Sequence, residues 1–244
     1  MGTPDTFIPG LEQYCDRWCE RCRLKARCAI FAQPHNQGGR PGASPDGTLA
    51  WQELQSALEA ALKLLQQATS SSDARARRWA APTRDDPHGA PTHPVIAAAH
   101  AYTRLVTAWL DTERGWLHDK RLAIRRQLHA SADPAAVIAA AEALCDALDV
   151  IAWDCTLIPA VLSRAVRGRG APQPYESPQG LAKLALVSID RSVSAWLRVR
   201  AARPGQPETV IPVLAQLDRL GRMVEGEFRE ARTFTRPGFD ACYH

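Results

Sequence analysis

Hydrophobic residues recur at three- and four-residue steps along most of the chain, which is the spacing of one face of an α-helix. In "WQELQSALEAALKLLQQA", residues 51–68, a tryptophan and several leucines fall on one such stripe. The pattern therefore predicts an amphipathic helix over this stretch.

Four more helices are predicted further along the chain. The second runs from Pro94 to about residue 129. The third starts at Asp133-Pro134, a favourable N-cap followed by proline at the first helical position, and reaches about residue 166. Ser177-Pro178 marks the start of the fourth, and the fifth covers residues 207–232. The apolar stripe of the second helix is Val95, Ala99, Tyr102, Val106, Trp109, Trp116 and Ile124. That of the third helix is Ile138, Ala141, Cys145, Leu148, Ala152 and Cys155. That of the fifth helix is Val210, Val213, Leu217, Leu220, Val224 and Phe228.

Strand signals are few, so the sequence predicts an all-α protein, a bundle of about five helices with a short N-terminal metal-binding segment that carries four cysteines. We expect this segment at residues 1–33, a Gly/Pro-rich linker at 34–48, the bundle at 49–234 and a C-terminal tail at 235–244.

Composition places the chain among ordinary globular proteins. It has 244 residues, of which 45% are apolar and 23% charged, and its net charge of +4 gives only weak support to nucleic-acid binding. The excess of arginine over lysine and the abundant alanine indicate a GC-rich bacterial source. The sequence shows neither a secretory signal pattern nor an apolar run of about 18 residues, so we expect a cytoplasmic protein with no membrane partner.

The densest chemistry lies in "YCDRWCERCRLKARCAIF", residues 14–31, where Cys15, Cys19, Cys22 and Cys28 have the spacing C-x3-C-x2-C-x5-C. Clustered thiols in the cytoplasm indicate metal or redox chemistry more often than disulfides. If residues 11–22 are helical, the first three thiols share one face and the chain must turn to bring Cys28 in as a fourth ligand. Five basic residues against three acidic ones between positions 11 and 28 would offset an anionic centre.

Two metals fit four thiols. Structural zinc sites usually combine two C-x2-4-C pairs separated by a dozen or more residues, whereas compact thiolate sets are typical of iron–sulfur clusters. "CERCRLKARC" resembles the C-x2-C-x5-C segment that holds a 4Fe–4S cluster in WhiB-like regulators, endonuclease III/MutY DNA glycosylases and RecB-type iron–sulfur nucleases. The resemblance covers residues 15–28 alone and implies that the four cysteines are cluster ligands. Zn²⁺ stays open as the alternative, while the C-x3-C-x2-C spacing of radical-SAM enzymes is disfavoured by the fourth cysteine.

The bundle offers weaker candidates. Lys183 and Asp190 share one face of an apolar helix and could line a small-molecule pocket or form a structural ion pair. His100 could be a ligand or a hydrogen-bonded core residue. An acidic stripe, Glu142, Asp146 and Asp149, fits a solvated face better than a di-iron site, because no Glu-x-x-His motif accompanies it. Cys145 and Cys155 lie on the apolar stripe and are expected to be inert.

Three functions follow as hypotheses. The first is a 4Fe–4S protein in redox sensing or electron transfer, with a redox partner protein. The second is a zinc-stapled helical interaction module, and the third is an enzyme with a pocket near Lys183 and Asp190. In each, we expect the cysteine segment to dock on the bundle through Trp18, Ile30 and Phe31.

Overall fold

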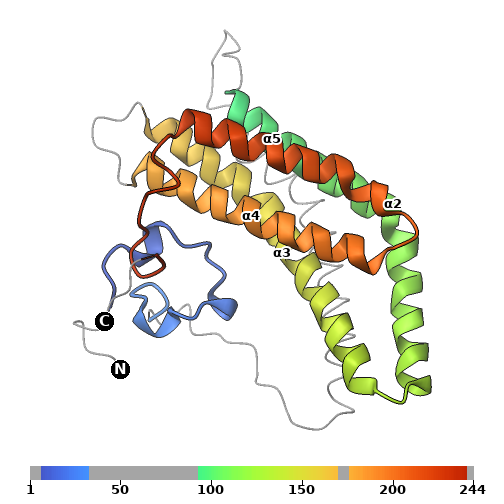
Figure 1. Ribbon diagram of the computed structural model, residues 1–244. Coiled ribbons are helices and arrows are strands. Elements are labelled where there is room, and N and C mark those ends of the chain that lie inside the picture. The colour runs from blue at the N-terminus through green and yellow to red at the C-terminus, as the bar shows by residue number, and fades with distance from the viewer. Residues whose placement is uncertain (1–6, 33–92, 170–175, 241–244) are drawn as a thin grey trace, which may run out of the picture.

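The computed structural model describes residues 7–32, 93–169 and 176–240, and four long helices dominate these residues (Figure 1). They are α2 (Pro94–Ala130), α3 (Pro134–Gly168), α4 (Pro178–Ala202) and α5 (Ile211–Glu227). No strand occurs in the described residues, so the predicted all-α class is confirmed. The helix predicted at residues 51–68 and the linker at 34–48 lie outside the described part of the chain.

Side-chain caps start three of the helices where the sequence placed them, and the cap of α2 is His93, which accepts from the Val95 N–H. Asp133 accepts a hydrogen bond from the Ala136 N–H at 3.1 Å, and Ser177 accepts one from the Gly180 N–H at 3.4 Å. Each cap satisfies an N–H that has no partner within its own helix. The fifth helix is shorter than predicted, because a 3-10 turn, η6 (Pro207–Val210), precedes it and the chain leaves the helix at Phe228.

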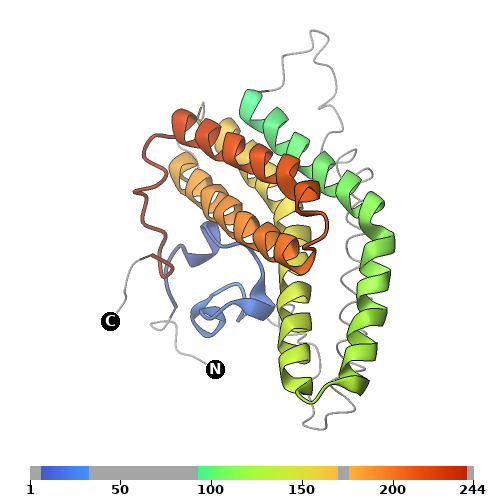
Figure 2. The ribbon, with the colours of Figure 1, turned by 45° about the vertical axis from the view of Figure 1, so that its right-hand side comes forward.

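The helices form a closed ring of neighbours. α3 packs against α2 and α4, and α5 closes the ring against α2 and α4. Short connections between α2 and α3 and between α4 and α5 make these neighbours antiparallel, as in an up-and-down bundle. Seen from two directions, the α2–α3 hairpin extends beyond the end of the α4–α5 pair (Figures 1 and 2).

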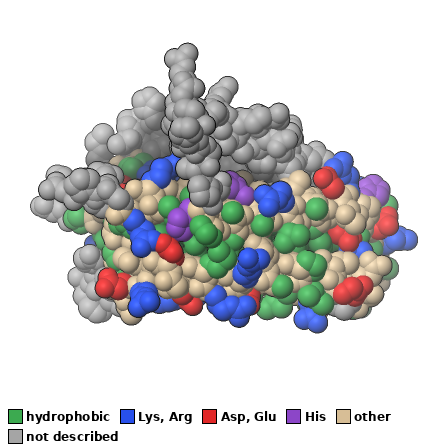
Figure 3. Space-filling model, turned by 90° about the horizontal axis from the view of Figure 1, so that it is seen from above, with side chains coloured by type: hydrophobic (Ala, Val, Ile, Leu, Met, Phe, Trp, Pro, Cys, Tyr) green, Lys and Arg blue, Asp and Glu red, His purple; other side chains and the backbone are tan. Residues whose placement is uncertain are grey.

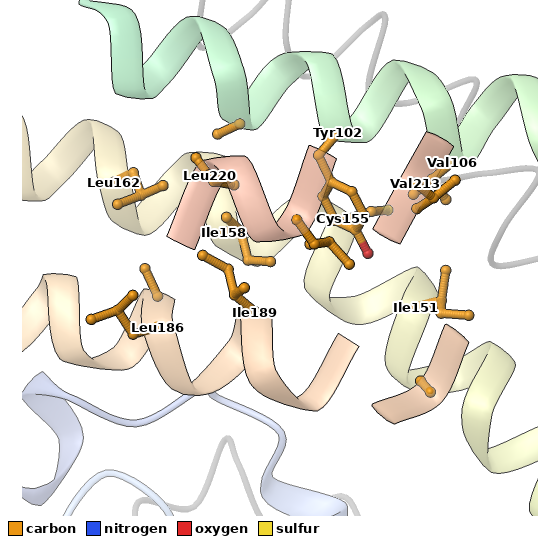
Figure 4. Close-up of a cluster of buried hydrophobic side chains, with 14 of the residues drawn as sticks. Tyr102, Val106, Ile151, Cys155, Ile158, Leu162, Leu186, Ile189, Val213 and Leu220 are labelled. Atoms are coloured by element: carbon orange, nitrogen blue, oxygen red, sulfur yellow. The ribbon is translucent and has the colours of Figure 1, made fainter. Parts of the chain in front are cut away.

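The core follows the predicted stripes over the part of the bundle where all four helices meet. Tyr102, Ile151, Ile158 and Leu186 have almost no exposed surface and point toward one another between the helices (Figure 4). Burial is weaker toward the free end of the α2–α3 hairpin, where Ile124 of the predicted stripe is only half-buried. The core therefore belongs to the four-helix part, and the hairpin tip carries little of it.

One face of the molecule is mixed in charge. On the face in Figure 3 that is not drawn in grey, basic and acidic side chains are interspersed with apolar ones, without a field of one sign. Among the described helices, none combines the length and apolar character needed to cross a bilayer.

Truncating one buried leucine tests the core. Leu186 is 0% exposed, whereas Leu197, on the same helix, is 46% exposed. We expect Leu186→Ala to lower the free energy of unfolding by about 2–5 kcal/mol, because it removes buried methyl groups and leaves a cavity. Leu197→Ala should change it by less than about 1 kcal/mol. Urea denaturation followed by circular dichroism measures both, and equal effects would contradict this core.

Candidate metal centre

The cysteine segment is not the helix that the spacing predicted. Its described part, residues 7–32, contains three 3-10 turns, Leu11–Gln13, Cys19–Arg21 and Lys25–Arg27, joined by irregular chain. A helix over residues 11–22 is broken at Arg17, whose φ of 60° lies in the left-handed region. Beside it, Asp16 Oδ1 accepts a hydrogen bond from the Trp18 N–H at 3.1 Å, a local turn that competes with helical bonding.

The segment folds back on itself. The Ile8 N–H donates to the Arg27 carbonyl at 3.0 Å, which joins its two ends. Ile8, Leu11 and Cys28 form a small buried cluster, separate from the bundle core. Partly buried side chains pack on this cluster: Leu24, Ile30, Phe31 and Phe239.

Phe239 comes from the C-terminal tail, so residues from both ends of the chain build this cluster. Gly238, with a φ of 75°, lies so close that a Cβ on it would be 2.9 Å from methyl groups of Ile8 and Leu11. Of the three side chains expected to dock on the bundle, Ile30 and Phe31 pack on this cluster, and Trp18 contacts α3.

All four thiols lie within this segment, and none is in a disulfide. Cys28 is buried and the other three are half-buried. Burial raises the pKa of the Cys15 thiol, with negative charge at Cys28 adding to the effect and Arg17 opposing it. Burial also raises the pKa of Cys19, again with Cys28 adding to it and then Cys22. Cys28 thus raises the pKa of two other thiols of the segment.

The four thiols are not arranged around a common point, as the ligands of one metal centre would be. Within the ranges that the structure describes, no three His, Cys, Asp or Glu side chains are close enough to hold a metal ion. The ligand set Cys15, Cys19, Cys22 and Cys28 therefore stays a prediction. A preformed site rarely exists in an unfolded chain, so metal binding at such a segment would be coupled to its folding.

The loop between Cys15 and Cys19 sits on α3. Trp18 stacks on Trp153, with ring centroids 5.1 Å apart and planes inclined by 18°. The Trp153 indole N–H donates to the Asp16 carbonyl at 3.0 Å. The guanidinium of Arg21 lies 4.3 Å from the Trp18 ring centroid, and that of Arg191 lies 5.6 Å from it. Cation–π contacts of this kind stabilise an aromatic ring at a surface.

A network of ion pairs adjoins the stacked rings of Trp18 and Trp153. Arg191 of α4 donates through Nη1 to Asp16 at 2.6 Å and through Nε to Asp154 of α3 at 3.0 Å. A second bond joins Arg191 Nη2 to Asp154, and Ser192 donates to the same carboxylate at 3.1 Å. The Asp154 side chain has no exposed surface, and burial raises its pKa, opposed by the hydrogen bonds and charge of Arg191.

Two further contacts fix the segment at its flanks. The Tyr14 hydroxyl accepts a hydrogen bond from the Ser177 N–H at 2.9 Å, and the Tyr14 ring meets Phe234 edge to face. On the other side, Arg21 reaches Asp146 at 3.0 Å and Asp149 at 2.7 Å. Two of the three acids predicted to form a solvated stripe therefore bind the cysteine segment.

The candidates in the bundle have different partners from those expected. Lys183 donates to the Arg232 carbonyl at 2.6 Å, and Asp190, 57% exposed, pairs with the Arg232 guanidinium. The two residues meet one arginine in the chain that follows α5, and they do not form with each other the structural ion pair that the sequence left open. A substrate pocket beside them stays a prediction.

His100 is an exposed residue of α2, so its expected place in the core is wrong. Partial burial lowers its pKa, with Arg104 adding to the effect. Cys155 is buried as expected, whereas Cys145 is only half-buried.

Sequence reasoning missed Trp153, Asp154 and Arg191, which form the surface of the bundle on which the cysteine segment docks. One signal was available: Asp154 is an acid in the apolar run "VIAWDCTLIP", in phase with the buried Ile151 and Ile158. A carboxylate at such a position needs a partner from another element.

Comparison of the chain with protein-family models, with curated proteins and with solved structures gave no match.

A methyl group at Gly180 should loosen the segment without unfolding the bundle. A Cβ there would lie 2.3 Å from Cε1 of Tyr14 and 2.8 Å from Cε1 of Phe234. We expect Gly180→Ala to displace Tyr14 and to raise amide hydrogen exchange at residues 8–28. Gly115→Ala is the matched control: its Cβ meets nothing within 4 Å. It should stabilise α2 by up to about 1 kcal/mol. Unchanged exchange in Gly180→Ala would show that Tyr14 does not anchor the segment.

The two bundle cysteines should be poor nucleophiles. Burial raises the pKa of Cys155 to about 12 and that of Cys145 to about 11. At Cys145 the negative charge of Asp149 adds to the effect of burial. About one Cys145 thiol in a thousand is then ionised at pH 8. Alkylation by iodoacetamide, quantified for each cysteine by mass spectrometry, should rise tenfold per pH unit from 7 to 9.5. In the urea-unfolded chain the rise should instead slow near pH 8.5, where about half of the free thiols are ionised. The same slowing near pH 8.5 in the folded protein would refute the raised values.

Proposed function

We propose that this protein binds a 4Fe–4S cluster through Cys15, Cys19, Cys22 and Cys28 and acts in redox sensing or electron transfer. The observation that carries the proposal is the gathering of four free thiols in one irregular segment, where Cys28 acts electrostatically on both Cys15 and Cys19. An irregular chain can shift its thiols onto a metal centre more easily than a rigid helix can.

The donor set fits such a centre in charge. A 4Fe–4S centre with four thiolates is anionic, and Arg17 lies near enough to Cys15 and Cys19 to oppose the rise in their pKa. The segment would shield a bound centre from solvent only in part. Cys28 is buried beside Ile8 and Leu11, while Cys19 and Cys22 keep access to solvent. When bound, the cluster would supply reversible one-electron chemistry, and the segment would supply ligands and shield the inner side.

A zinc-stapled interaction module is the second candidate. It is favoured by the docking of the segment, because Trp18, Tyr14 and Arg21 all join it to the bundle. Structural zinc would fix this arrangement without redox activity. Metal analysis separates the two candidates, since only the cluster contains iron and sulfide and absorbs broadly in the visible range.

The test is anaerobic purification followed by iron, sulfide, zinc and absorption measurements. We expect about four iron and four sulfide per chain. Cys15→Ser, Cys19→Ser, Cys22→Ser and Cys28→Ser should each lose most of the bound metal, because serine is a poor ligand for these soft metals.

Cys145→Ser is the matched control and should keep the full metal content, since Cys145 lies on α3 outside the segment. Zinc in place of iron would contradict the 4Fe–4S cluster and favour the zinc-stapled interaction module. Full metal content in Cys19→Ser or Cys22→Ser would contradict the ligand assignment.

A further inference from the structure

We propose that Arg191 of α4 is a positioning residue for the thiol centre: it holds the loop between Cys15 and Cys19, so that docking of the segment and binding of the metal stabilise each other. This inference rests on the proposed function and adds the means by which the state of the centre reaches the bundle.

The contacts that hold the loop are adjacent to two of the predicted ligands. Asp16 directly follows Cys15, and Trp18 directly precedes Cys19. Asp16 is bound at its side chain by Arg191 and at its carbonyl by the Trp153 indole. Trp18 is held by the Trp153 ring. The positions of two thiols are therefore set by residues of α3 and α4.

Arg191 is specific to this role because it serves two carboxylates at once. One belongs to the bundle, where the fully buried Asp154 requires a cation, and the other belongs to the loop. Because Asp154 fixes the guanidinium with two hydrogen bonds, the remaining N–H groups point to a defined place, where they receive Asp16. A lysine would keep the charge but not this two-sided geometry.

The coupling must act in both directions. If docking places Cys15 and Cys19 for the metal, a bound metal must stabilise docking by the same factor. Residues that orient metal ligands from outside change metal affinity by about 10- to 100-fold when they are removed. Loss of the metal would weaken the docking of the loop on Trp153 by the same factor, so the surface of α3 and α4 that the loop covers would be exposed more often.

The experiment uses the full-length apo protein and Co²⁺ alone as the probe, because thiolate-bound Co²⁺ gives a charge-transfer band whichever metal is native. The affinity is measured against a competing chelator. Asp16→Asn removes the charge facing Arg191 but keeps the oxygen that accepts from the Trp18 N–H, and it leaves the Arg191–Asp154 pair intact. We expect it to weaken Co²⁺ binding by about tenfold, and Arg191→Met by about 10- to 100-fold.

Arg191→Lys should recover part of the loss, because lysine keeps the positive charge but not the two-sided geometry. Arg222→Met is the matched control, because Arg222 forms an exposed ion pair with Asp218 on α5 and should bind Co²⁺ like the wild type. A second readout is hydrogen exchange. In the wild type, Co²⁺ should slow exchange at residues 14–20 of the segment and at 150–155 of α3, and in Asp16→Asn the slowing at α3 should be lost.

The outcomes separate the two proposals. Equal Co²⁺ affinity in the wild type, Asp16→Asn and Arg191→Met, within twofold, would overturn the coupling and leave the metal centre standing. Binding of neither Co²⁺ nor iron by the wild type would overturn the proposed function, and the coupling with it. If Arg191→Met fails to fold, Asp16→Asn alone decides.

Discussion

A carboxylate inside a helical core is the constraint on which the arrangement of this protein depends. Asp154 lies among apolar neighbours on α3 with no exposed surface, and an isolated charge at such a place would cost several kcal/mol. Arg191 and Ser192 on α4 satisfy it, which fixes how these two helices face each other. Arg191 is only partly buried, so one of its N–H groups reaches the surface, where Asp16 accepts a hydrogen bond from it. The place where the cysteine segment sits thus follows from a charge in the core.

The segment and the bundle are stabilised in different ways. The bundle has continuous apolar stripes on four helices, and the core that they bury takes only Tyr14 from residues 7–32. The segment has only Ile8, Leu11 and Cys28 at its centre, too few to offset the loss of conformational entropy in an isolated chain of this length. It is completed by contacts made elsewhere: a tryptophan stack, ion pairs and one phenylalanine from the tail.

The fold could be predicted from the sequence because its signals are local. Prolines, caps and apolar stripes located α2, α3 and α4 almost to the residue, since each signal acts within one or two helical turns. The segment could not be predicted in this way. Its spacing allows a helix, but Arg17 adopts a left-handed conformation, and the contacts that hold this shape come from residues more than a hundred positions away. The pairing of Asp16 with Arg191 has no sequence pattern at all, and the partner of Asp190 was missed for the same reason.

Gly238 and Phe239 pack on the small cluster around Ile8 and Leu11, and this limits when the segment can fold during synthesis. During synthesis the four thiols emerge long before Gly238 and Phe239, which pack on the cluster of Ile8, Leu11 and Cys28. The segment therefore cannot reach its final packing until residues 238 and 239 have left the ribosome. Over that interval the thiols stay accessible, both to oxidants and to whatever delivers a metal. Delivery of a cofactor in that interval would reach Cys28 before its neighbours bury it, whereas the other three thiols stay partly accessible in the finished structure.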